Sequence, residues 1–260
     1  MYEAARLSLY FNAKLVVIHV GDRTDEKYQK FEDILAPFAK EGLEHEFIFT
    51  PGKPVEVILR ATHILKIDLL IIGALQRENV LNYYIGSIAR KITRKAKCSV
   101  LLLTNPSIDR VACNHIVVNG LKDPKTEQSI KTAFYIGHKL GAAKMTIVEE
   151  IRQQEIHVNV DDDISLRRAE ISREKLRRRE DSRVQKIVNE IPQEIKDQII
   201  IKTQPIFGQR GYSIGHYAEV VRADLLVMNA PSKTRFWDRL FPHDIEHILT
   251  ELPTDVLIIQ

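Results

Sequence analysis

The feature that most limits how this chain can fold is an internal duplication. Shifted by about 156 positions, residues 67–74 align with residues 223–230, and residues 99–103 align with residues 255–259, with no gap between the two matches. Upstream the shift falls to about 130, because the second copy carries about 26 additional residues. A repeat of this length predicts that one set of secondary-structure elements is built twice.

The duplication predicts two domains, residues 1–106 and residues 107–260. With 260 residues, of which 44% are hydrophobic, each copy can form a core of its own. The boundary falls at a turn-forming Asn-Pro-Ser sequence. The additional residues of the second copy form a charged stretch, which we expect to be a helical insertion at about 159–190.

Short apolar runs alternate with helical patterns along both copies. Uninterrupted apolar runs are typical of parallel strands that are buried on both faces. We therefore expect an α/β protein with two tandem, doubly wound, parallel-sheet domains of Rossmann-like form. The expected strands lie at 15–20, 46–49, 68–72, 99–103, 116–118, 145–148, 199–201, 224–228 and 255–259.

The two copies differ at their beginnings. The second copy starts with an expected strand at 115–120, followed by a helix through 129–140, whereas the first starts directly at the equivalent helix, residues 4–11. In a doubly wound sheet the first strand is central, and its loss would leave two strand edges unpaired. We therefore predict that the first domain lacks its N-terminal strand, and that an upstream segment precedes this sequence.

Charge and cysteine content restrict the class of protein further. The 38 basic and 35 acidic residues give a net charge of +3, which is not the concentrated basic charge of a nucleic-acid binder. Two cysteines, Cys98 and Cys113, fit a reducing compartment and provide no metal-ligand spacing. No apolar stretch is long enough to span a membrane. We expect a cytoplasmic protein that binds neither nucleic acid nor metal.

One segment of the first copy resembles the universal stress protein family. The buried run at 68–72 ends at Gly73, Gly86-Ser87 follows, and a helix then leads to a last strand introduced by Cys98. Nucleotide-binding members of that family carry a similar series of glycines that ends in Gly and Ser or Thr. The resemblance implies five-stranded parallel sheets, dimerisation, and ATP or AMP at the carboxyl ends of the strands.

The candidate binding site is in the first domain. Glycine after a buried strand lets backbone amides approach a phosphate, and the start of a helix offers free N–H groups together with the positive end of its dipole. These arguments select Gly73, Gly86 and Ser87, while Gln76 occupies the position of a further family glycine. His19, at the end of a buried strand, completes the predicted cofactor-binding set.

The second copy has lost this pattern. Its equivalent positions carry Asn229, Ser232, Pro242 and His243, and proline cannot donate an N–H to a phosphate. Asn119 stands where an acidic residue would end the first strand of the family's fold. We therefore expect no nucleotide in the second domain.

Three further sequence patterns have simpler explanations. Residues 243–247 spell His-x-x-Glu-His, a zinc-protease pattern, but no third ligand can be named, so surface histidines are favoured. Residues 161–186 mix acidic and basic side chains at helical spacing, which favours a solvated helix whose apolar residues could dock on the sheet or on a partner. Residues 236–241 form a bulky apolar tip, which either covers the domain's own empty pocket or contacts a partner.

No nucleophile–base pair is recognisable in the sequence, so we expect a binding or regulatory protein and not an enzyme. We expect the two domains to pair with each other through a pseudo-twofold that imitates the homodimer of the family. We also expect a homodimer of the whole chain and a protein partner of unknown identity. The alternative hypothesis is a nucleotide-free regulatory module that belongs to a membrane transporter or to another partner.

Overall fold

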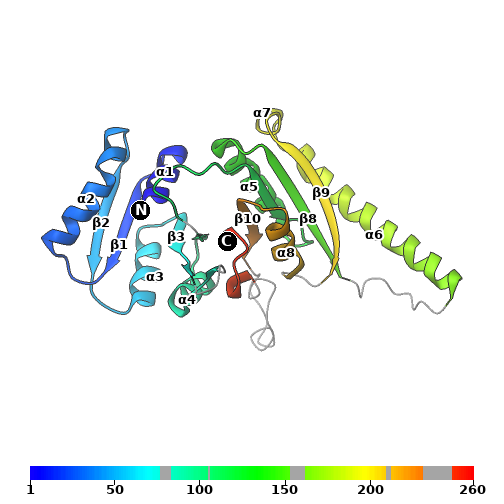
Figure 1. The fold of residues 1–260 in the computed structure, drawn as a ribbon, viewed down its shortest axis with the longest axis horizontal. Helices are drawn as coiled ribbons and strands as arrows, with labels where there is room; N and C mark the ends of the chain where they lie inside the picture. The colour runs from blue at the N-terminus through cyan, green and yellow to red at the C-terminus, as the bar shows by residue number, and fades with distance from the viewer. Residues whose placement is uncertain (77–82, 105, 153–161, 209–211, 231–247) are drawn as a thin grey trace. The chain divides into compact units, whose positions relative to one another are not determined.

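The computed structural model describes residues 1–76, 83–104, 106–152, 162–208, 212–230 and 248–260. The chain forms two compact units (Figure 1). Unit 1 comprises Met1–Ala112 together with Gln260, and unit 2 comprises Cys113–Ile259. The division falls after Ala112, a few residues beyond the sequence-based boundary at 106.

The first half of unit 1 is a pair of parallel strands with two helices. Its elements are α1 (Tyr2–Phe11), β1 (Leu15–Val20), α2 (Asp25–Lys40) and β2 (His45–Thr50). β1 and β2 pair in parallel, from Leu15 opposite His45 to Val20 opposite Thr50. The core of this half contains Ala5 of α1 and Leu35 of α2, both fully buried, with Leu15 of β1 packed among them.

The second half of unit 1 is a second parallel pair. Its elements are α3 (Pro54–Ile64), β3 (Leu69–Gly73), β4 (Leu75–Gln76), β5 (Tyr83–Tyr84), α4 (Ser87–Lys95) and β6 (Ser99–Leu103). β3 and β6 are parallel and pair over their whole length. The short strands β4 and β5 form an antiparallel hairpin between β3 and α4. Pro54 occupies the first turn of α3, where its missing N–H costs no helical hydrogen bond.

Unit 2 is a parallel sheet whose strands follow the order β11-β10-β7-β8-β9. The central strand β7 is buried along its whole length, as parallel strands covered on both faces are. The elements of the unit are β7 (His115–Asn119), α5 (Thr126–Leu140), β8 (Lys144–Arg152), α6 (Asp163–Asn189), α7 (Gln193–Lys196), β9 (Ile200–Gly208), α8 (Tyr212–Val220), β10 (Leu225–Asn229) and β11 (Asp255–Ile259).

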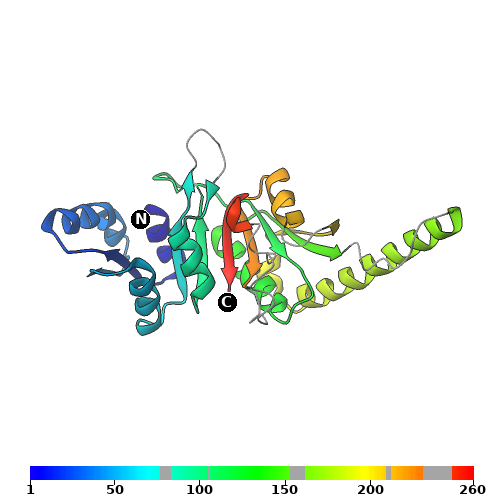
Figure 2. The ribbon, with the colours of Figure 1, turned by 90° about the horizontal axis from the view of Figure 1, so that it is seen from below.

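The charged insertion of the second copy contains the long helix α6, whose first half extends beyond the sheet (Figure 2). A capping box starts the helix: the Asp162 carboxylate accepts the Ser165 N–H at 2.7 Å, and the Ser165 hydroxyl lies 2.9 Å from the Asp162 N–H. Val184 and Val188 in the second half are buried, whereas Ile164 in the first turn is exposed. Ala169 in the first half is buried as well, so the helix docks on the unit from Ala169 onward.

The predicted fold class is confirmed. Both units are α/β with parallel strands, and the strand order in unit 2 is that of a doubly wound sheet, with strands added on either side of β7. Among the described residues of unit 1, no strand stands in the place that β7 occupies in unit 2. The second copy therefore has a central strand that the described part of the first copy lacks, as expected from the sequence.

Candidate functional site

The start of α4 is an uncapped helix N-terminus in unit 1. Gly86 is the N-cap residue, with φ −62° and ψ 161°, and makes no side-chain capping hydrogen bond to the first turn. No acidic residue lies in that turn, and Ser87 is exposed. In contrast, the first turn of α2 is capped by the Thr24 hydroxyl. The first N–H groups of α4 therefore have no capping side chain at the N-cap position.

The hairpin β4–β5 brings Gly73 and Gly86 to the same region. Gly73 ends β3 two residues before Leu75, and Gly86 follows two residues after Tyr84, the residue that pairs with Leu75. A Cβ built on Gly73 would meet no atom within 4 Å, so the backbone there is open to an approaching group. Gly73, Gly86 and Ser87 thus flank the base of one hairpin.

Gln76 lies in β4, opposite Tyr83 in the hairpin. The segment after Gly73 is therefore a strand of a hairpin at this point, which differs from an open phosphate-binding loop. Residues 77–82, at the tip, lie outside the described residues.

His19 lies in β1 and packs in an aromatic cluster. Its ring centroid is 5.9 Å from that of Phe31 on α2 and 5.5 Å from that of Phe49 on β2. These contacts hold the imidazole against α2 and β2, and none of them involves the start of α4. The role of His19 in ligand binding stays a prediction.

The positions of unit 2 that correspond to the candidate site make internal hydrogen bonds. The Asn229 side chain donates to the Thr126 hydroxyl at 3.0 Å, and the Asn119 side-chain oxygen accepts the Leu121 N–H at 3.0 Å. Ser232, Pro242 and His243 lie outside the described residues, as do the His-x-x-Glu-His pattern at 243–247 and the apolar tip at 236–241.

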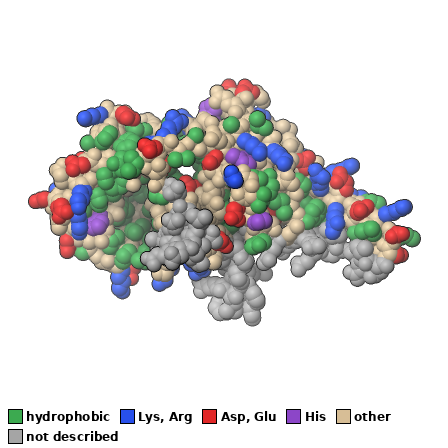
Figure 3. Space-filling view, in the orientation of Figure 1, with side chains coloured by type: hydrophobic (Ala, Val, Ile, Leu, Met, Phe, Trp, Pro, Cys, Tyr) green, Lys and Arg blue, Asp and Glu red, His purple; other side chains and the backbone are tan. Residues whose placement is uncertain are grey.

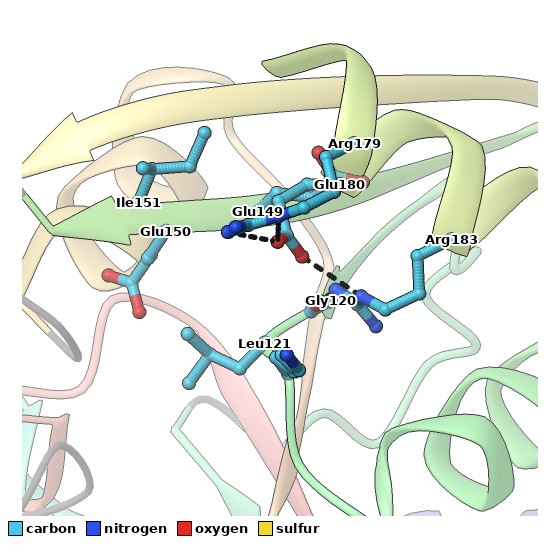
Figure 4. A pocket seen from close by; sticks show the side chains of 9 residues that line it. Gly120, Leu121, Glu149, Glu150, Ile151, Arg179, Glu180 and Arg183 are labelled. Carbon is cyan, nitrogen blue, oxygen red and sulfur yellow. Dashed lines mark hydrogen bonds and ion pairs between the residues drawn. The ribbon is translucent and has the colours of Figure 1, made fainter. Parts of the chain in front are cut away.

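Unit 2 contains a small cavity at the carboxyl ends of β7 and β8, beneath α6 (Figure 4). Its volume is about 100 Å³. It is lined by the segment that follows β7, by β8 and by α6, and the lining includes both acidic and basic side chains. The lining residues are Gly120, Leu121, Lys122, Glu149, Glu150, Ile151, Arg179, Glu180 and Arg183.

Glu149 is the unusual member of this cavity. It is 1% exposed, and among the described residues neither of its carboxylate oxygens has a hydrogen-bond partner. Burial raises the pKa of Glu149 to about 7, although the nearby Arg183 opposes the shift. Its carboxyl group therefore changes charge near neutral pH.

The neighbouring carboxylates are fully engaged. Glu180 accepts from Arg179 at 2.8 Å and from Arg183 at 2.9 Å, and Arg183 also donates to the Gly120 carbonyl (Figure 4). Burial raises the pKa of Glu180, but the two guanidinium groups outweigh it and hold that pKa below its ordinary value. Glu150 accepts the Ile214 N–H at 2.8 Å, in the first turn of α8. The Arg183 contact fastens α6 to the end of β7, and the Glu150 contact fastens α8 to β8.

Sequence reasoning did not identify the pair Glu149-Glu150. Both residues follow directly on the apolar run at 145–148, so the available signal was two carboxylates at the end of a buried strand. The capping role of Glu150 and the buried position of Glu149 depend on α6 and α8, which arrive from distant parts of the chain.

Comparison with known proteins assigns the first unit. Residues 19–104 match the sequence model of the universal stress protein family. This part of the chain is similar to universal stress proteins. The resemblance to this family is thereby confirmed, and Gly73, Gly86 and Ser87 lie within the matched residues. A search of curated proteins gave no match.

Solved structures of universal stress proteins share the fold of the whole chain. A universal stress protein from Archaeoglobus fulgidus DSM 4304 is 14% identical, with a TM-score of 0.64, and the match covers 100% of this chain and 92% of that chain. A candidate universal stress protein from Pseudomonas aeruginosa UCBPP-PA14 is 15% identical, with a TM-score of 0.66, over 98% and 86% of the two chains. A functionally unknown protein from Pseudomonas aeruginosa PAO1 is 15% identical, with a TM-score of 0.67, over 98% and 85%. Identities this low show the fold alone.

Other kinds of site do not stand out in the described part of the chain. Three or more His, Cys, Asp or Glu side chains do not come together there in a metal-binding arrangement. None of the helices among these residues is both long enough and apolar enough to cross a membrane. Both thiols are free, and burial raises the pKa of Cys98 and brings that of Cys113 to about 12, which disfavours the reactive thiolate.

Proposed function

We propose that this protein is a regulatory binding protein of the universal stress protein type, and that unit 1 binds ATP or AMP through the start of α4. The phosphates would contact the N–H groups of the first turn and the Ser87 hydroxyl, with Gly73 leaving room on the opposite side. Ligand binding would then change the surface that a protein partner contacts. The proposal assigns no catalytic role, and it leaves unit 2 without nucleotide.

The observation that supports this proposal best is the uncapped first turn of α4 within the matched universal stress protein domain. An anion placed there would accept hydrogen bonds from the N–H groups of the first turn and would interact with the positive end of the helix dipole. The turn contains no carboxylate that would repel a phosphate. Arg90 and Lys91 follow on the same helix.

Calorimetric titration of the full chain with Mg-ATP and Mg-AMP tests the proposal. We expect saturation near one nucleotide per chain. Ser87→Pro should lower the affinity at least about tenfold, because proline removes one N–H and the hydroxyl. The helix should persist in this variant, since proline is favoured at the first helical position and the Gly86 backbone is already extended.

Ser87→Ala is the matched control, because it keeps the N–H group and loses only the hydroxyl. Its affinity should fall between those of the unchanged chain and Ser87→Pro. Absence of heat up to millimolar nucleotide, with a folded protein, would contradict nucleotide binding by unit 1.

The β4–β5 hairpin favours a second candidate function. Because Gln76 pairs with Tyr83 instead of leaving an open glycine loop, unit 1 could act as a nucleotide-free regulatory module of a membrane transporter or of another partner. The same titration separates the two candidates, since this second one predicts no binding of ATP or AMP.

A further inference from the structure

The first half of α6 carries an excess of positive charge. Within residues 164–179, seven side chains are basic and two are acidic. Residues 180–189, in the second half of the helix, carry two of each. The excess is therefore confined to the part of α6 that precedes Glu180.

Most of this positive charge is not neutralised within the chain. Arg178 forms an ion pair with Glu174 at 2.8 Å, and Arg179 forms one with Glu180 at 2.8 Å. Among the described residues, no ion pair or side-chain hydrogen bond engages four other basic side chains, namely Arg167, Arg168, Lys175 and Arg177. These four cations remain available to an external anion.

Two of the unpaired cations share a helix face with two exposed isoleucines. Residues that are three or four positions apart follow one another along the same face of a helix. Ile164, Arg168, Ile171 and Lys175 are spaced in this way, and we call them the outer face of α6. Ile164 is 62% exposed and Ile171 is 55% exposed. The outer face therefore alternates apolar and basic side chains.

The sheet of unit 2 leaves the outer face uncovered. Ala169 and Glu180, which lie on the opposite side of the helix by the same periodicity, are the buried residues of this stretch. Figure 2 shows that the first half of α6 extends beyond the sheet. In Figure 3, basic and hydrophobic side chains are both visible at the surface of this end of the unit. A broad, flat partner could approach the outer face without displacing a contact of the fold.

We propose that the outer face of α6 binds the surface of an anionic phospholipid bilayer. The helix lies in the plane of the headgroups, as basic amphipathic helices do. Ile164 and Ile171 enter the boundary between headgroups and acyl chains, while Arg168 and Lys175 contact the negative charges of the lipids. This proposal does not depend on nucleotide binding, because it concerns unit 2 and not the start of α4.

The isoleucines favour a bilayer over a nucleic acid as the anionic partner. The phosphates of RNA would also attract the four cations. However, nucleic-acid surfaces offer bases on which aromatic side chains stack, and Ile164 and Ile171 have no aromatic ring. A bilayer provides negative charge and an apolar layer beneath it, so it matches both components of the outer face.

Co-sedimentation of the full chain with lipid vesicles tests the proposal. We expect binding to vesicles of phosphatidylcholine mixed with phosphatidylserine, and much weaker binding to vesicles of phosphatidylcholine alone. Replacing two cations, as Arg168→Gln with Lys175→Gln, should lower the affinity for the mixed vesicles at least about tenfold. The matched control, Lys139→Gln with Lys202→Gln, removes the same charge from exposed positions outside α6 and should change the affinity by less than about threefold.

A second variant tests the apolar component separately. Ile171→Ser should weaken binding to the mixed vesicles at least about threefold at low and at high salt, because it removes a buried apolar contact. In contrast, the effect of the charge variant should shrink as salt is added. Ile200→Ser, at a residue of β9 that is 71% exposed, is the matched control and should bind as the unchanged chain does. All four variants alter exposed side chains, and circular dichroism checks that they remain helical.

Three results would overturn the proposal. The first is equal binding, or none, to the two kinds of vesicle. The second is an equal loss of affinity in the folded outer-face variants and in their controls. The third is binding of a single-stranded RNA oligomer that depends on Arg168 and Lys175 while vesicle binding does not, since the outer face would then bind nucleic acid.

Discussion

At the scale of single residues, Glu149 is held in an environment that disfavours its charge. Its carboxyl group is buried under α6, and neither oxygen has a hydrogen-bond partner among the described residues. A buried, unpaired carboxylate is costly, so the neutral form is stabilised and the pKa rises from 4.5 to about 7. The folded protein therefore binds this proton more tightly than the unfolded chain does.

The sign of the resulting pH dependence follows from linkage. Below pH 4.5 Glu149 is protonated in both states and carries no penalty, and its contribution to stability falls as the pH rises from about 4.5 to about 7. We compare the free energy of unfolding of Glu149→Gln with that of the unchanged chain at each pH. The difference, in favour of the variant, should be larger at pH 8 than at pH 5 by about 2–3 kcal/mol. Denaturant unfolding at both pH values measures this difference. An equal difference at pH 5 and pH 8 would show that Glu149 titrates normally.

At the scale of elements, the equivalent helices α1 and α5 of the two copies end in the same way. The C-cap residue of α1 is Asn12, with φ 50°, and that of α5 is Gly141, with φ 76°. Both residues adopt the left-handed conformation, in which glycine and asparagine are favoured and a Cβ is otherwise costly. The two copies thus share a left-handed helix C-cap, which is asparagine in the first copy and glycine in the second.

This geometry predicts the effect of replacing Gly141. Gly141→Ala should lower the free energy of unfolding by about 1 kcal/mol, because the strain is in the backbone and a Cβ would meet no atom within 4 Å. Gly141→Asn, which introduces the residue type that Asn12 provides at the end of α1, should cost less. Unfolding in denaturant compares the two variants, and an equal loss in both would point to a cause other than backbone conformation.

The sequence predicts most elements well and fails where distant segments meet. Uninterrupted apolar runs such as 99–103 predict the strands with nearly their observed bounds, because burial on both faces leaves a direct signature. The β4–β5 hairpin is not predicted, since two-residue strands have no periodicity. The sequence pattern leaves open whether the apolar residues of α6 dock on the sheet or on a partner, and the structure shows that Val184 and Val188 are buried within unit 2.

The candidate site is predictable only in part. Gly73, Gly86 and Ser87 are identified by their spacing and by the family they resemble, and the structure brings them to the base of one hairpin. The sequence places His19 in the same pocket, but its direction depends on the rings of Phe31 and Phe49, which no local pattern reveals. The cavity around Glu149 requires α6, whose path over the sheet is a property of the tertiary fold.

At the scale of the whole molecule, the two copies of the fold should differ in local stability. Unit 2 has a continuous sheet around β7, whereas β1 and β3 of unit 1 each have an unpaired edge among the described residues. We expect amides of β1 and β3 to exchange at least about tenfold faster than those of β7 and β8 in the unchanged chain. Hydrogen exchange followed by mass spectrometry or NMR measures this ratio. Equal protection in the two units would show that both edges are already covered.

The contrast between the edge strand β9 of unit 2 and the strands β1 and β3 of unit 1 indicates where the chain would start to aggregate. Pro205 lies within β9, and a residue without an N–H blunts a sheet edge against addition of foreign chains. β1 and β3 contain neither proline nor a Lys, Arg, Asp or Glu side chain within Leu15–Val20 and Leu69–Gly73. Loss of solubility on heating or concentration would therefore begin in unit 1, and a lysine introduced at Val16 or Leu70 would act there as a gatekeeper.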